Sequence, residues 1–108
     1  MDKYDLICQK GADFRRVMRL KKNGEYLDLT GWSGKSQVRV EPDGGEMVCE
    51  IAVTVDDSEN KIILSIEEEI TAALSVGCFA WDIKLTDADG ITKYYVGGKF
   101  NVVPSVTE

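Results

Sequence analysis

The chain is short, acidic and contains no histidine. Its 108 residues include 13 Lys and Arg against 19 Asp and Glu, and this net charge of −6 is spread along the sequence. The length fits one domain, residues 1–108, with its own core. The acidic balance argues against nucleic acid as a partner and favours protein partners. Because no run reaches the roughly 20 apolar residues of a bilayer span, no membrane partner is expected.

Strand signals begin near the N-terminus. Alternating residues 4–9 predict a short strand suited to a sheet edge, and residues 14–20 predict a second. Asn23-Gly24 predicts a tight hairpin turn that returns the chain through residues 26–29. Arg16 falls on the apolar parity, which indicates an edge position, a bulge or an ion pair.

The middle of the chain adds three strands and a helix. Residues 35–41 and 62–66 predict strands, and Pro42 to Gly45 predict a turn. The cleanest half-buried strand is marked by alternating Met47, Cys49, Ile51, Val53 and Val55. A short helix is expected from about Glu67 to Leu74, capped by Ser65 or a neighbour and ended by Gly77. Its three glutamates lie at the N-terminal end, where the helix dipole favours negative charge.

The segment from Gly77 to Val102 predicts a long hairpin that turns at Asp89-Gly90. The side chains predicted to face the core are Phe79, Trp81, Ile83, Leu85, Tyr94, Val96, Phe100 and Val102. Together the elements indicate an all-β fold, an antiparallel, Ig-like β-sandwich with one short helix before the final hairpin. A small closed barrel is the alternative.

Three cysteines, Cys8, Cys49 and Cys78, match neither a disulfide framework nor a zinc-ligand pattern. We interpret them as reduced, core-filling thiols of a chain that folds in a reducing cytoplasm. Cys8 and Cys49 fall within apolar alternation, so a thiol reagent is expected not to reach them in the native state.

The sequence offers no set of catalytic residues. The absence of histidine removes the commonest general base and metal ligand, and no serine or cysteine has a partner in a recognisable spacing. The acidic clusters lack calcium-loop spacing, and the glycine pairs lack the context of a phosphate-binding loop. The expectation is a protein that is not an enzyme, with no cofactor, metal or small-molecule substrate.

Aromatic residues supply the candidates for a binding surface. Tyr95 has the parity opposite to Tyr94 and shares it with Lys93 and Lys99, which predicts an exposed group for a partner contact. Trp32, in a segment flanked by glycines, is a further interface candidate. A rival hypothesis is a carbohydrate-binding module, in which Trp32, Tyr95 and Tyr26 form a sugar-stacking platform.

Five segments carry a resemblance to a known family. They are Gln-Lys-Gly-Ala-Asp-Phe at 9–14, Asn-Gly-Glu-Tyr-Leu-Asp-Leu-Thr-Gly-Trp at 23–32 followed by Gln-Val-Arg at 37–39, Gly-Cys-Phe-Ala-Trp-Asp-Ile-Lys-Leu-Thr-Asp at 77–87, Gly-Lys-Phe-Asn-Val at 98–102 and Val-Thr at 106–107. In this order they resemble a family of small phage and prophage virion proteins and are similar to the N-terminal module of phage upper baseplate proteins. Two features depart from the pattern: Lys10 is inserted, and the sequence stops at Glu108 where a baseplate protein would continue.

The resemblance implies a non-catalytic structural or adaptor protein of the virion, as a tail, baseplate or connector component. Its partners would be other virion proteins, with self-association left open. It would be made and folded in the cytoplasm of the bacterial host and then located in the virion. A free-standing module of this kind suits docking at a strand edge or by flat-face contact.

Overall fold

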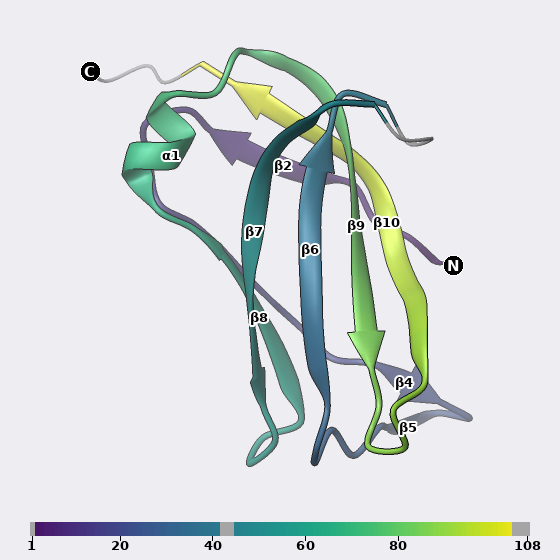
Figure 1. Ribbon diagram of the computed structural model, residues 1–108. Helices are drawn as coiled ribbons and strands as arrows, with labels where there is room; N and C mark the ends of the chain where they lie inside the picture. The colour runs from purple at the N-terminus through teal and green to yellow at the C-terminus, as the bar shows by residue number, and fades with distance from the viewer. Residues whose placement is uncertain (1, 42–44, 105–108) are drawn as a thin grey trace.

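The computed structural model, which describes residues 2–41 and 45–104, folds one long sheet around a single apolar core (Figure 1). The strands form an all-β sandwich that nearly closes on itself, with one short helix before the last hairpin, as the sequence predicted. Residues 42–44 of the predicted turn at 42–45 lie outside the described residues.

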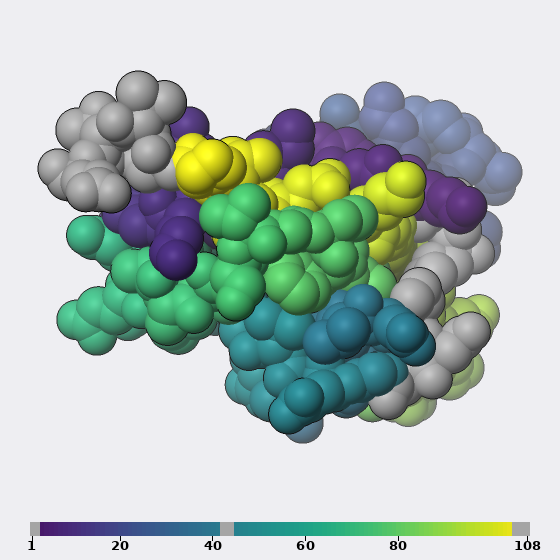
Figure 2. Space-filling view, turned by 90° about the horizontal axis from the view of Figure 1, so that it is seen from above, coloured from purple at the N-terminus to yellow at the C-terminus, as the bar shows by residue number. Residues whose placement is uncertain are grey.

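The described part of the chain forms ten strands. They are β1 (Asp2–Lys3), β2 (Leu6–Gln9), β3 (Phe14–Met18), β4 (Lys21–Lys22), β5 (Glu25–Tyr26), β6 (Ser33–Arg39), β7 (Met47–Asp56), β8 (Lys61–Ile66), β9 (Gly77–Thr86) and β10 (Thr92–Val103). The main sheet has the order β1-β10-β9-β6-β7-β8-β3, with β2 also paired to β10. Both N-terminal strands run parallel to β10, which the antiparallel expectation did not include. Figure 2 shows the purple N-terminal segment against yellow β10.

The hairpin predicted at Asn23-Gly24 is shorter than expected. β3 pairs with β8, and only β4 and β5 pair across the turn at Asn23-Gly24. The φ angles of Asn23 and Gly24, 55° and 82°, are those of a type I′ turn, which tolerates few residues other than Asn and Gly. The turn prediction is therefore confirmed, and a short hairpin pairs across it, but residues 14–18 pair with β8 instead of with the returning strand.

The core is continuous and almost entirely apolar. Trp81, Ile83 and Leu85 of β9 are at most 3% exposed, which confirms the alternation predicted there, whereas Phe79 is half-buried. In β7, Cys49 and Ile51 are buried but Met47 is 45% exposed. The pairing of β6 with β7 shifts between Val38 and Arg39, so that Val48 is an extra residue in β7 and breaks the inward alternation at that end of the strand.

The helix α1 (Glu68–Ala72) is shorter than predicted, and its cap comes from elsewhere in the chain. The backbone N–H of Glu68 donates to Oδ1 of Asp13 at 2.8 Å, in place of the expected Ser65 cap. The hydroxyl of Thr71, fully buried, donates to the carbonyl of Ala12 at 2.8 Å. Gly77 begins β9 rather than ending the helix.

Within residues 2–41 and 45–104, no helix has both the length and the apolar character that crossing a bilayer requires.

Candidate interaction groove

The two ends of the main sheet face each other along a seam where the barrel does not close. One side of the seam is β3, and the other is the N-terminal segment that pairs with β10. At one end Arg16 bridges the seam: its Nη2 donates to the carbonyl of Ile7 at 2.7 Å. Its guanidinium also lies 4.7 Å from the centre of the Phe14 ring. Arg16 therefore occupies the predicted edge position, and no carboxylate of the described residues pairs with it.

An open groove of about 980 Å³ lies along this seam. Its floor is apolar and consists of the buried residues Leu6, Leu64, Trp81 and Val96. One wall contains Arg16, Val17 and Met18 of β3 without interruption, and Arg19 and Leu20 continue it toward the β4–β5 hairpin. Because alternate side chains of a strand point to opposite faces, an unbroken run shows that the edge of β3, rather than one of its faces, borders the groove.

Cations line the rim of the groove, although the protein as a whole is acidic. The rim cations are Lys3, Arg16, Arg19, Lys21, Lys22 and Lys93, and the acidic side chain among the lining residues is Asp87. Six of the 13 cations of the chain thus gather at one site, although the charges are spread along the sequence. The sequence signal was the dense run of Arg and Lys from position 15 to 22.

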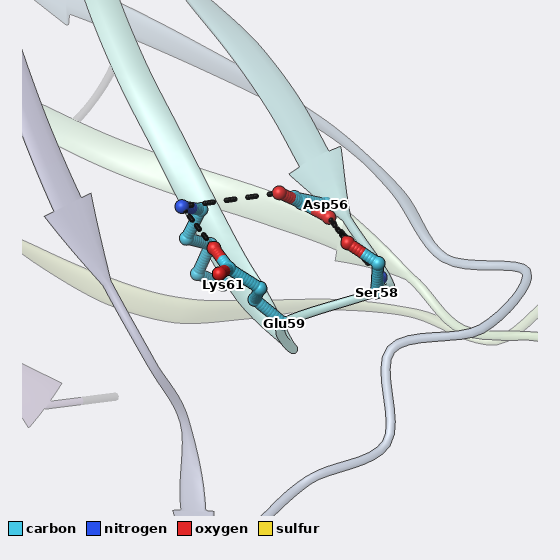
Figure 3. Close-up of polar contacts among 4 residues, drawn as sticks. All are labelled: Asp56, Ser58, Glu59 and Lys61. Atoms are coloured by element: carbon cyan, nitrogen blue, oxygen red, sulfur yellow. Dashed lines mark hydrogen bonds and ion pairs between the residues drawn. The ribbon is translucent and has the colours of Figure 1, made fainter.

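None of the rim cations is neutralised by an ion pair within the described part of the chain. The ion pairs found there join Lys61 to Asp56 and Glu59, in the turn between β7 and β8 (Figure 3). Asp56 also accepts a bond from the Ser58 hydroxyl, which lowers the pKa of Asp56. The Nζ of Lys21 instead lies 4.9 Å from the ring centre of Tyr26. The rim therefore keeps its positive charge available to an anionic partner.

A β-bulge decides which candidate residues reach the groove. The pairing of β10 with β9 shifts between Tyr94 and Val96, so that Tyr95 is the extra residue. Tyr95 turns inward and packs on Trp32, with ring centres 5.6 Å apart at 54°, while Tyr94 is 57% exposed. The prediction of Tyr94 in the core and Tyr95 on the outer face is therefore wrong.

The bulge brings three of the four interface candidates together. Lys93, Tyr95 and Trp32 line the groove, but Lys99 does not. Lys99 lies in a second hollow of about 740 Å³ that also contains Arg39 and Asp82. Desolvation raises the pKa of Asp82, and the positive charges of Arg39 and Lys84 oppose that rise. Because this hollow mixes both signs of charge, it has no comparable preference for an anion.

The described residues do not bring together the side chains that a metal site needs. No cluster of three or more Cys, Asp or Glu side chains that could hold a metal ion occurs among them, and the chain has no histidine. Burial raises the pKa of the Cys49 thiol to about 11 and also raises that of Cys8, so both are poor nucleophiles. Cys78 is exposed, which corrects the prediction that all three cysteines fill the core.

The fold places the chain among β-sandwich proteins with a nearly closed sheet. No protein-family model matches the sequence, and no curated protein matches it. Among solved structures, the crystal structure of CopC from Methylosinus trichosporium OB3b is similar, with a TM-score of 0.54 and 15% sequence identity. The match covers 95% of this chain and 89% of that chain, and at this identity it shows a shared fold alone.

Proposed function

We propose that the protein is a non-catalytic structural or adaptor component of a phage or prophage virion, acting through protein–protein contacts at the groove. The observation that carries the proposal is the seam itself. There a free strand edge, an apolar floor and cations that form no ion pair with any described residue adjoin one another. An edge strand left open by a nearly closed sheet is a template for another chain. The sequence motifs that resemble those of virion proteins are the reason to place this contact within a virion.

The side chains around the seam have the composition of a protein interface. Tyr4 is 57% exposed, Ile7 is 57% exposed and Val17 is 42% exposed, although each is large and apolar or aromatic. Aromatic residues and arginine are enriched where proteins meet, and lysine at the rim steers association more than it adds affinity. Trp32 and Tyr95 add a rigid, half-buried anchor beside these residues.

Mass spectrometry of purified particles tests the proposal. We expect the chain in particles released from the host that encodes it, at a fixed ratio to other virion proteins. Lys21→Glu with Lys22→Glu should reduce that ratio, because it reverses the charge of the hairpin on the rim. Arg15→Glu with Lys35→Glu is the matched control, since both residues are exposed, lie outside the groove lining and give the same charge change. Particles that lack the wild-type chain would contradict the proposal.

A carbohydrate-binding module is the second candidate, because Trp32, Tyr26 and Tyr95 all line the one groove. The 54° tilt between Trp32 and Tyr95 gives a stepped surface rather than a flat platform for sugar stacking. Titration with neutral oligosaccharides, followed by tryptophan fluorescence, distinguishes the two functions. Saturable binding that is lost in Trp32→Ala would favour the sugar-binding module over the adaptor.

A further inference from the structure

We infer that the groove takes an extended acidic segment of a partner protein, which adds as a strand to the free edge of β3. The inference rests on the proposed function and specifies the chemistry of its partner. Three features of the seam support it: the free edge, the charge of the rim and the apolar floor.

The free edge determines the backbone conformation of the partner. β3 pairs with β8 on one side only, and its residues Arg16, Val17 and Met18 border the groove on the other side. An edge of this kind presents a row of N–H and C=O groups that an extended chain can pair with. The bridge from Arg16 to the Ile7 carbonyl closes the seam at one end, so the added strand lies between this bridge and the β4–β5 hairpin.

The charge of the rim determines the polar side chains of the partner. Six cations face the groove against one carboxylate, and no described residue pairs with any of the six in an ion pair. A lysine- or arginine-rich segment would be repelled, whereas aspartate and glutamate are attracted. Among the described side chains, every acidic one except Asp87 lies outside the groove lining, so the remaining surface would repel the same acidic segment and leave the groove as the favoured site.

The floor determines the remaining side chains of the partner. Successive residues of a strand point to opposite faces, so one set would lie on Leu6, Leu64 and Val96 while the other meets the cations. The expected partner sequence therefore alternates apolar with acidic residues. This alternation distinguishes the expected peptide from other polyanions, because they have no apolar side chains that could pack on the floor of the groove.

Selection from a random decapeptide library against the wild-type protein tests the inference. We expect the enriched peptides to be acidic and to alternate acidic with apolar residues, relative to the unselected library. Enrichment of basic or neutral peptides, or no enrichment over the library, would overturn the inference.

A selected peptide then tests each feature separately. In an added strand, every second backbone amide of the peptide points toward β3. N-methylation of that set of amides should weaken binding about tenfold or more, because it removes the hydrogen bonds to β3, whereas N-methylation of the other set should not. Lys21→Glu with Lys22→Glu should weaken binding by a similar factor, and Arg15→Glu with Lys35→Glu should change it little. Circular dichroism of each variant confirms folding. If neither methylated set weakens binding, the strand-addition inference is wrong.

Heparin and single-stranded oligothymidine serve as rival anions. Either of them displacing the peptide at equal charge concentration would show that the groove recognises charge alone, which also overturns the inference. Failure of the peptide experiments leaves the particle experiment intact: a chain that enters particles without selecting acidic strands would be a virion component that docks in another way.

Discussion

Trp81 joins the floor of the groove to the N-terminal segment. Its indole Nε1 donates to the carbonyl of Tyr4 at 2.7 Å, and the residue is 3% exposed. Trp81→Phe keeps an aromatic ring but leaves that carbonyl without this donor, so the free energy of unfolding should fall by about 1–3 kcal/mol in urea titrations. Trp32→Phe is the control, because no described hydrogen bond uses the Trp32 indole, and equal losses in both variants would contradict this account.

The three cysteines should differ sharply in reactivity. Cys78 is exposed, whereas Cys8 and Cys49 are 1% and 8% exposed. A thiol reagent counted by intact mass should add one label per native chain and three after unfolding in denaturant. Rapid addition of a second label under native conditions would show that the core around Cys8 and Cys49 opens easily.

Cys49 also makes stability depend on alkaline pH. Desolvation raises its pKa from 9.0 to about 11 in the folded protein. Between these pH values the unfolded chain has lost the thiol proton and the folded protein has kept it, so the free energy of unfolding falls as pH rises from 9 to about 11. Chemical denaturation across this range should show a steeper decline in the wild type than in Cys49→Val, which cannot titrate. Parallel curves would contradict the assignment.

At the scale of elements, α1 depends on a loop 55 residues earlier in the chain for its cap. Asp13→Ala removes the acceptor of the Glu68 N–H, and stability should fall by about 0.5–2 kcal/mol, as for other lost caps. Asp57→Ala, in the exposed turn between β7 and β8, provides a control of the same chemistry. Thermal unfolding of both variants measures the difference, and an unchanged midpoint for Asp13→Ala would argue against the cap.

The elements also show what the sequence could and could not predict. Alternation correctly predicted the buried side of β9, because every second residue there is large and apolar. In β10 it correctly predicted that Val96, Phe100 and Val102 are buried, but it failed at Tyr94 and Tyr95. A bulge there leaves no periodic signal, because either tyrosine suits either face. The glycine pair at 97–98 has a packing role that its sequence context does not reveal: a Cβ on Gly98 would lie 2.7 Å from the Tyr4 carbonyl oxygen, so this glycine permits close approach of the N-terminal segment.

The groove was beyond sequence reasoning for a related reason. Its parts come from segments far apart in the chain, including Lys3, Lys22 and Lys93, and only the return of β10 beside the N-terminus brings them to one rim. The net charge of the chain is negative, so it does not reveal that this groove is lined mainly by cations. The sequence did single out Lys93, Tyr95 and Trp32 as interface candidates. It could not show that they line one groove, because that depends on the bulge at Tyr95.

At the scale of the whole molecule, one core joins every layer. The buried cluster takes residues from β2, β3, β6, β7, β8, β9 and β10, so no part of the sheet has a separate interior. We therefore expect a single cooperative transition, with tryptophan fluorescence and far-ultraviolet circular dichroism giving the same urea midpoint. Two separated midpoints would contradict the expectation of one domain.

The pairing of β2 with β10 has a consequence for the order of events during synthesis. The strands β1 and β2 leave the ribosome before the other strands of this domain, but they find their partner only in residues 96–103, at the far end of the described sheet. Until then β3 can reach β8, but the N-terminal strands remain unpaired, and contacts this distant in sequence form slowly. The nascent chain thus exposes a longer strand edge than the finished protein does, and premature docking at that edge is a hazard of translation itself.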